Sequence, residues 1–240
     1  MEKTNAERFI EAYNQIDYAL RVQYNFKRSM SFSDVVRRTV VLNAIVRKYE
    51  DLLIDYGRLR NAIVHQNNAE EIIAEPHTKV VEKMEHIATL IVTPPKVIDT
   101  VARKNILCVQ ADLSIKKTIE TINQSGYSNL PIYKEGVLVG VANGQRILDR
   151  IGLEIYKKTD INNFIENTPI SEVERQDGLD TYYSLSDENL TLDTALDMFY
   201  KNRKLLIIIM TKTGNYLEKP LGIITSSDII DMNQILDNFE

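Results

Sequence analysis

The sequence has 240 residues, 44% hydrophobic and 26% charged, with a net charge of −5, the composition of an ordinary globular protein of about two domains. The first 93 residues carry thirteen basic and thirteen acidic side chains, and the remainder is more acidic. Neither part has the excess of basic residues expected of a protein that binds duplex nucleic acid with high affinity. The single cysteine, Cys108, excludes an internal disulfide. The single cysteine, the charged N-terminus and the shortness of the apolar runs together predict a cytoplasmic protein with no membrane partner.

Helical periodicity dominates residues 1–93. The capping box Thr4-Asn5-Ala6-Glu7 starts a helix that runs into the twenties. Ser33-Asp34 caps a second helix whose apolar stripe continues into the fifties, where Gly57 is expected to interrupt it. Pro76 begins a further helix with one apolar face. This region is therefore expected to be a small all-α bundle.

Arg60 and His65 form the first candidate site, because they lie five residues apart near the end of a predicted helix. A guanidinium can brace a phosphate, and a histidine can move a proton near neutral pH. The pair resembles the Arg-x4-6-His motif of HEPN domains, all-α bundles that usually dimerise and include metal-independent ribonucleases. The resemblance makes Arg60 and His65 catalytic candidates. A structural alternative stays open, in which His65 caps the helix and Arg60 pairs with an acid such as Asp55.

Thr93-Pro94-Pro95 marks a boundary, because consecutive prolines do not continue a helix and favour an extended link. Beyond it, the sequence repeats itself. Each copy predicts the order helix, strand, turn, strand, helix, with a longer turn in the second copy. The matching segments are 113–122 with 190–199, 129–133 with 204–208, and 136–142 with 218–224.

The second copy ends in a strand-to-helix corner containing Gly222, Thr225, Ser226 and Asp228. A glycine in a strand permits close approach to the backbone, and a helix start offers unpaired N–H groups to an anion. The hydroxyl of Thr225 and the carboxylate of Asp228 suit the vicinal hydroxyls of a ribose. The alternative is an ordinary helix start, with Thr225 as its cap.

The two copies and the motif Gly-x-x-Thr-x-x-Asp resemble a tandem pair of CBS domains, named after cystathionine β-synthase. The resemblance covers the chain from about Pro95 onward and predicts a pair over 94–240 of two β-α-β-β-α repeats. With the helical domain over residues 1–93, the expected fold class is α+β. The parts of the pair are a first repeat at about 95–153, a linker at 154–182 and a second repeat at 183–240. The resemblance implies that Thr225 and Asp228 hold the ribose of an adenosine-type nucleotide. The other ligand-binding residues it suggests are Ser226, Leu206, Ile207, Tyr183 and Lys204.

The first copy departs from this motif, since Asn143 replaces the threonine and Arg146 replaces the aspartate. An arginine cannot accept hydrogen bonds from a ribose, although Arg146 could serve a phosphate in the neighbouring cleft. One competent site is therefore expected. The ligands compatible with it are AMP, ADP, ATP, cyclic di-AMP and S-adenosylmethionine. No metal is expected, because His77 and His86 lack partners at ligand spacing.

The leading hypothesis is a nucleotide-sensing regulatory protein, in which the CBS pair controls a helical module that forms a homodimer. The alternative is a nucleotide-gated, metal-independent endoribonuclease that uses Arg60 and His65 and takes RNA as its partner. A third interpretation is a dimerisation scaffold with empty clefts.

Overall fold

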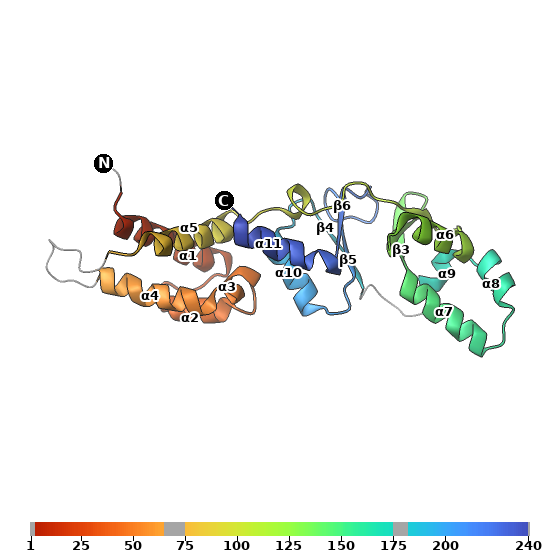
Figure 1. The fold of residues 1–240 in the computed structure, drawn as a ribbon, viewed down its shortest axis with the longest axis horizontal. Coiled ribbons are helices and arrows are strands. Elements are labelled where there is room, and N and C mark those ends of the chain that lie inside the picture. The colour runs from red at the N-terminus through yellow and green to blue at the C-terminus, as the bar shows by residue number, and fades with distance from the viewer. Residues whose placement is uncertain (1–2, 65–74, 175–181, 240) are drawn as a thin grey trace. The chain divides into compact units, whose positions relative to one another are not determined.

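The computed structural model describes residues 3–64, 75–174 and 182–239, and it confirms the predicted α+β class (Figure 1). The chain forms two compact units. The helical unit contains residues 1–96, 191–198 and 230–240, and the sheet unit contains residues 97–190 and 199–229.

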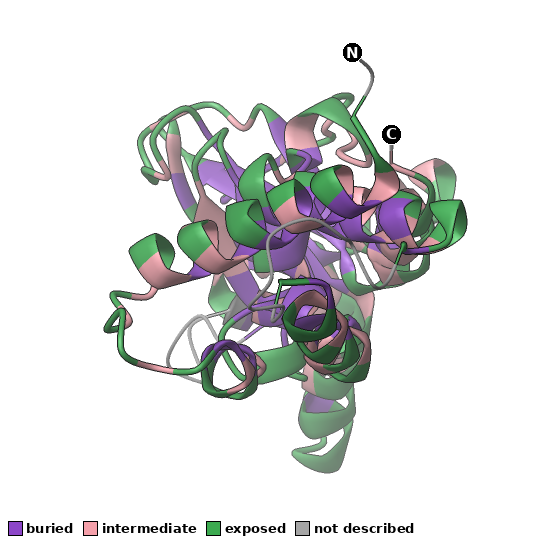
Figure 2. Cartoon of the chain, turned by 90° about the vertical axis from the view of Figure 1, so that its left-hand side faces the viewer, coloured by how far each residue is buried: buried purple, intermediate pink, exposed green. Residues whose placement is uncertain are grey.

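Five helices from the first part of the chain form most of the helical unit. They are α1 Asn5–Gln23, α2 Phe32–Thr39, α3 Ala44–Lys48, α4 Glu50–Val64 and α5 Thr78–Val92. Most of α10 (Leu192–Lys201) and α11 (Ile229–Asn238) belongs to the same unit. α1 packs mainly on α5, and the buried ring of Phe9 in α1 meets Tyr56 of α4 edge-to-face at 5.5 Å. Helices are buried on one side and exposed on the other in Figure 2, as their apolar stripes predict.

The start of α1 is as predicted, but α2 is capped by Ser31 rather than by Ser33-Asp34, and the predicted break at Gly57 does not occur. The capping box forms, with Thr4 N donating to Glu7 Oε2 at 2.8 Å and Glu7 N donating to Thr4 Oγ1 at 3.2 Å. Gly57 does not interrupt a helix, since α4 runs through it. A Cβ at Gly57 would lie 3.1 Å from Phe32 Cδ1, so the glycine makes room for that ring. The break comes earlier, where Asn43 caps α3.

Two three-stranded sheets of the same topology form the sheet unit. In each, the first strand pairs parallel to the second, and the second pairs antiparallel to the third. The first sheet contains β1 Val109–Gln110, β2 Asn129–Lys134 and β3 Val137–Asn143; the second contains β4 Tyr183–Ser186, β5 Ile207–Met210 and β6 Gly222–Thr225. The remaining helices are α6 Ile115–Ser125, α7 Gly144–Tyr156, α8 Ile161–Asn167 and α9 Ile170–Glu174, with short 3-10 turns at Val97–Asp99 and Ser226–Asp228. The repeat in the sequence is thus a repeat in structure.

Local sequence explains the turns of the first repeat. Gly126 ends α6 with φ of 71°, a left-handed conformation that favours glycine. The hairpin between β2 and β3 turns at Glu135 and Gly136, which both have positive φ. Such a two-residue turn matches the twist of antiparallel strands.

The two sheets share one apolar core. It contains Tyr133, Leu138 and Val141 from the first sheet, and Tyr183, Ile207, Ile209 and Ile223 from the second, with Tyr182 just before β4. A separate core fills the first repeat and includes Ile170 and Val173 of α9, so the predicted linker contributes to that core. Residues from both sheets therefore meet in one core of the sheet unit.

Candidate functional site

Thr225 and Asp228 form a closed, hydrogen-bonded corner at the end of β6. Asp228 Oδ2 accepts from Thr225 N at 2.6 Å and from Thr225 Oγ1 at 3.0 Å. Thr225 Oγ1 also lies 2.6 Å from Ser227 Oγ. Both Thr225 and Asp228 are buried, at 8% and 7% exposed. The two residues form the capping box of a helix start, which is the alternative interpretation of this motif, and each hydrogen-bonds the other.

The second oxygen of Asp228 is held by Arg103, a residue that the sequence reasoning did not identify. Arg103 Nη2 donates to Asp228 Oδ1 at 3.0 Å. The backbone of Arg103 forms a two-way bridge with Ile223, which fixes the arginine beside β6. Its guanidinium also lies 5.9 Å from the ring centre of Tyr127. A cation and an aromatic ring thus accompany the carboxylate at this corner.

Gly222 permits a close approach, as its position in the strand predicts. A Cβ at Gly222 would lie 2.7 Å from Ile98 Cδ1, 3.0 Å from Met210 Cε and 3.1 Å from Ala102 Cβ. The space is therefore filled by the protein's own side chains. This packing holds the segment that leads to Arg103 against β6.

The remaining predicted contacts divide into core residues and surface residues. Tyr183 and Ile207 are buried in the core that the sheets share, with the partly exposed Leu206 packed against it. The N–H of Ser226 donates to the carbonyl of Leu206 at 3.0 Å, so it is already used. Lys204 is exposed, and its backbone N–H donates to Asn202 Oδ1 at 3.0 Å.

The equivalent corner of the first repeat has become a structural cap. Asn143 Oδ1 accepts from Arg146 N at 3.2 Å, and Asn143 Nδ2 donates to Asn129 Oδ1 at 2.8 Å. The guanidinium of Arg146 lies 4.1 Å from the ring centre of Tyr182, a cation–π geometry. Tyr182 packs edge-to-face on Tyr183 at 5.4 Å. Arg146 is thus placed against Tyr182, the residue directly before β4.

Polar contacts fix α10 and α11 within the helical unit. Asn43, which caps α3, donates to Asp193 Oδ2 of α10 at 3.1 Å, and Arg47 pairs with Asp197. Burial raises the pKa of the Asp193 carboxyl.

The last turn of α11 has partners in the same unit. Lys48 Nζ lies 2.7 Å from Asp237 Oδ1, and this hydrogen bond lowers the pKa of the Asp237 carboxyl. The ring nitrogens of His86 lie 2.8 Å from the carbonyl oxygen of Phe239 and 3.0 Å from that of Leu236. The C-terminal helix is therefore anchored at its end.

Of the candidate pair Arg60 and His65, only Arg60 lies among the described residues. Arg60 lies on α4, with its guanidinium 5.5 Å from the ring centre of Tyr13. The salt bridge to Asp55 is made by Arg58, at 2.8 Å, rather than by Arg60. His65 lies outside the described residues, so the distance between the two catalytic candidates stays a prediction.

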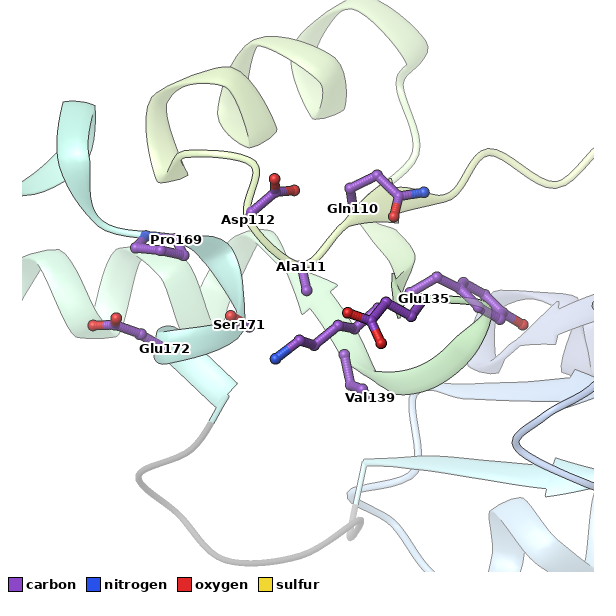
Figure 3. Close-up of a pocket in the computed structure, with 10 residues that line it drawn as sticks. Gln110, Ala111, Asp112, Glu135, Val139, Pro169, Ser171 and Glu172 are labelled. Carbon is purple, nitrogen blue, oxygen red and sulfur yellow. The ribbon is translucent and has the colours of Figure 1, made fainter.

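A pocket of about 500 Å³ lies beside the turn between β2 and β3 of the first repeat, and Figure 3 shows the residues that line it. Its position follows from the register, because β2 and β3 turn near Val139 and Glu135, whereas Asn143 lies at the opposite end of β3. Ala111 and Val139 give the pocket an apolar floor, and Ser171 lies at its wall in Figure 3. None of the residues that line this pocket is among the predicted site residues.

Comparison with known proteins identifies the first repeat. Residues 97–152 match the family model described as CBS domain. No curated protein matches the sequence. None of the helices in the described ranges is long and apolar enough to span a bilayer.

Solved structures resemble the chain only distantly. A Methanocaldococcus jannaschii protein proposed as an archaeal homolog of g-AMPK has 17% identity and a TM-score of 0.46, covering 62% of this chain and 49% of its own. The CBS domain of a bacterial CNNM/CorC family Mg²⁺ transporter in complex with ATP has 17% identity and a TM-score of 0.44, covering 63% and 96%. CBSX2 in complex with AMP has 16% identity and a TM-score of 0.44, covering 60% and 98%. This chain thus spans about half the length of the first of these proteins.

Proposed function

We propose that this chain is a cytoplasmic nucleotide-sensing regulator, in which the pair of repeats binds one adenosine-type nucleotide at the Thr225–Asp228 corner. The observation that carries the proposal is the buried carboxylate of Asp228, held between Thr225 and the guanidinium of Arg103. A buried carboxylate needs hydrogen-bond donors, and ribose hydroxyls can supply them in place of a guanidinium. A ribose hydroxyl would then replace the Arg103 guanidinium as the hydrogen-bond donor, so that the carboxylate of Asp228 stays hydrogen-bonded.

The charges beside the corner favour a ligand with phosphate. When a ribose takes Oδ1 of Asp228, the guanidinium of Arg103 becomes available to an anion nearby. The ring of Tyr127, 5.9 Å from that guanidinium, offers a stacking surface for a base. AMP, ADP and ATP carry both a phosphate and the vicinal ribose hydroxyls. Cyclic di-AMP carries phosphates but only the 2′-hydroxyl of each ribose, and the cationic sulfonium of S-adenosylmethionine does not gain from an arginine.

Control of the helical module would pass through α11. This helix begins directly after Asp228, and its residues from 230 onward belong to the helical unit. Lys48 and His86 hold its last turn. A change in the turn at Ser226–Asp228 on binding would therefore reach helices that we expect to be HEPN-like and to pair in a homodimer.

Calorimetric titration with AMP, ADP, ATP, cyclic di-AMP and S-adenosylmethionine tests the proposal. We expect binding of at least one phosphate-bearing adenosine ligand with a stoichiometry of one per chain. The matched control is Asn143→Ala, which alters the equivalent corner of the first repeat and should leave that affinity unchanged. Absence of binding below millimolar concentration for every ligand would overturn the proposal.

The second candidate function is a metal-independent endoribonuclease gated by the nucleotide. Arg60 Nε is buried and lacks a hydrogen-bond partner within the described ranges, which leaves a donor for a phosphate. Incubation with single-stranded RNA in EDTA, with and without nucleotide, should show cleavage that Arg60→Ala removes. Cleavage that persists in an Arg60→Ala/His65→Ala variant would exclude this site.

A further inference from the structure

The strongest charge asymmetry in the sequence lies between Arg21 and Lys48. These 28 residues contain seven basic side chains and one acidic side chain, Asp34. The segment carries a charge of +6 in a chain of −5, which leaves −11 on the other residues. Asp34 itself is engaged at the start of α2, where its Oδ2 accepts from Ser31 Oγ at 2.7 Å. A concentration of one sign of charge within an oppositely charged chain draws anionic partners to that place.

Three of the seven cations serve the fold of the helical unit, and four do not. The paired cations and their acids are Arg21 with Asp17, Arg47 with Asp197, and Lys48 with Asp237. The other four are exposed and pair with no acidic side chain in the part of the chain that the structure describes. These four, which we call the α2 basic surface, are Lys27, Arg28, Arg37 and Arg38.

A largely buried arginine holds the turn that carries Lys27 and Arg28. Arg21 Nη1 donates to the carbonyl of Lys27 at 2.8 Å, and its Nη2 donates to that of Met30 at 3.0 Å. The side chain of Arg21 is 15% exposed, and its Nε donates to Asp17 Oδ2 at 2.8 Å. A turn that is fixed in advance lowers the ordering cost of binding a partner.

The stability of α2 does not explain where these four cations lie. Arg37 and Arg38 in the last turn favour the helix dipole, but Lys27 and Arg28 precede the positive N-terminal end, where a cation is unfavourable. The buried residues of α2 are Phe32, Val35, Val36 and Thr39. This leaves Arg37 and Arg38 on the outer face. The helix is about 12 Å long, which corresponds to about three or four phosphate groups of a stacked strand.

We propose that the α2 basic surface binds the phosphate backbone of a single-stranded nucleic acid. Three of its four cations are arginines, whose planar guanidinium presents two parallel N–H donors to phosphate oxygens. Phe26 directly precedes Lys27, and its half-buried ring lies 6.1 Å from the ring centre of Tyr24. Such a ring suits the face of an unpaired base, which a duplex keeps within its own stack.

This inference goes beyond nucleotide sensing and beyond cleavage, because the surface includes neither the Thr225–Asp228 corner nor Arg60. With four cations, binding should be weak and strongly dependent on salt. Each phosphate that a single strand contributes adds about 0.7 to the slope of log affinity against log salt, so four contacts predict a slope of about −3. A tenfold rise in salt should therefore weaken binding by about 10²- to 10³-fold.

Fluorescence anisotropy of the full-length chain with short labelled oligouridylate and oligothymidylate tests the proposal. Both probes should bind, because they share the phosphate backbone. Neither contains adenosine, and oligothymidylate lacks the 2′-hydroxyl that cleavage would use. A tighter complex with oligouridylate would identify RNA as the source of the phosphates, and equal affinity would identify the backbone of both nucleic acids.

The matched variants remove two cations each. Arg37→Gln/Arg38→Gln should weaken binding at low salt and reduce the magnitude of the salt slope by about 1.4, with the circular dichroism unchanged. The control Lys212→Gln/Lys219→Gln removes the same charge from exposed positions of the sheet unit and should leave affinity and slope as in the wild type. If the arginine variant does not fold, Lys27→Gln/Arg28→Gln makes the same test on the turn before α2.

A salt slope that Arg37→Gln/Arg38→Gln leaves unchanged, or that the control reduces equally, would overturn the proposal. Displacement of the probes by polyglutamate or by phosphatidylserine vesicles at equal charge would also overturn it, because the surface would then take acidic polypeptides or an anionic membrane. The measurements involve no adenosine ligand. Failure of this inference can therefore be told apart from failure of the proposed function.

Discussion

Arg103 and Asp228 are 125 residues apart in the sequence, yet Arg103 Nη2 donates to Asp228 Oδ1 at 3.0 Å. The side chain of Arg103 is 39% exposed and that of Asp228 is 10% exposed, so the pair lies at the edge of the buried corner. The bond joins the segment entering the first repeat to the motif that closes the second. It also supplies the group that a bound ribose would have to replace.

The coupling between Arg103 and Asp228 should be measurable but modest. Because the arginine is partly exposed, solvent screening limits the coupling to about 0.5–1 kcal/mol in a double-mutant cycle of Arg103→Ala and Asp228→Asn. Urea unfolding of the ligand-free chain measures it. The matched control is Arg58 with Asp55, a pair at 2.8 Å with both side chains exposed, for which coupling near zero is expected. Equal coupling in both cycles would contradict this account.

Removal of the ribose contacts should weaken nucleotide binding. Thr225→Ala or Asp228→Ala should each cost about 1–3 kcal/mol of binding free energy, since each removes a buried polar contact. Titration calorimetry measures the loss. The control Asp231→Ala changes an exposed side chain in the first turn of α11 and should leave the affinity unchanged. A Thr225→Ala variant that binds as tightly as the wild type would remove Thr225 from the site.

Asn43 should be among the most sensitive polar residues of the helical unit. Its Oδ1 accepts from Ile45 N at 2.9 Å and Val46 N at 3.0 Å, and its Nδ2 donates to Asp193. Asn43→Ala should therefore reduce the free energy of unfolding by about 1–3 kcal/mol. Asn14→Ala, on the exposed face of α1, should change it little. Comparable effects of the two substitutions on denaturant unfolding would refute this role for Asn43.

Gly222→Ala should destabilise the sheet unit, because the added methyl group would overlap Ile98 Cδ1 and crowd Ala102. Overpacking of this kind costs about 1–3 kcal/mol. Gly152→Ala should be neutral or stabilise the fold by up to about 1 kcal/mol, since a Cβ at this position meets no atom within 4 Å. Thermal unfolding of both variants measures their stability relative to the wild type. A Gly222→Ala variant as stable as the wild type would show that the neighbouring side chains move to accept the methyl group, contrary to this prediction.

Glu154 should make the stability of the first repeat depend on acid pH. Hydrogen bonds from Thr159 and Lys157 lower the pKa of Glu154 below its ordinary value of 4.5. A carboxyl with a lowered pKa in the folded state contributes stability above its unfolded pKa and loses it as the pH falls through its folded pKa. The wild type should therefore be more stable than Glu154→Gln at pH 7. The difference should shrink as the pH falls below about 4.5.

Urea unfolding at several pH values measures this difference. Glu188→Gln, at an exposed position, is the control and should show no comparable trend. If the difference in free energy of unfolding between the wild type and Glu154→Gln stayed constant down to pH 3, Glu154 would not be the source of the pH dependence.

The fold could be predicted largely because its signals are local. Capping at Thr4, the two copies of the strand pattern and the corner at Thr225–Asp228 all depend on residues a few positions apart. The sequence predicts a helix break at Gly57, because glycine often ends a helix. In the structure this glycine lies within α4 and makes room for the ring of Phe32, and the break lies before α3 instead. Arg103 could not be predicted, because it lies in an irregular segment and its partner is distant in the sequence.

The position of a bound ligand tests the central claim most directly. A structure of the protein crystallised with AMP or ATP should place the ribose hydroxyls about 2.5–3.0 Å from the carboxylate oxygens of Asp228, with the bond from Arg103 broken. A nucleotide found instead in the pocket beside Val139, or an intact bond between Arg103 and Asp228 with the ligand bound elsewhere, would contradict it.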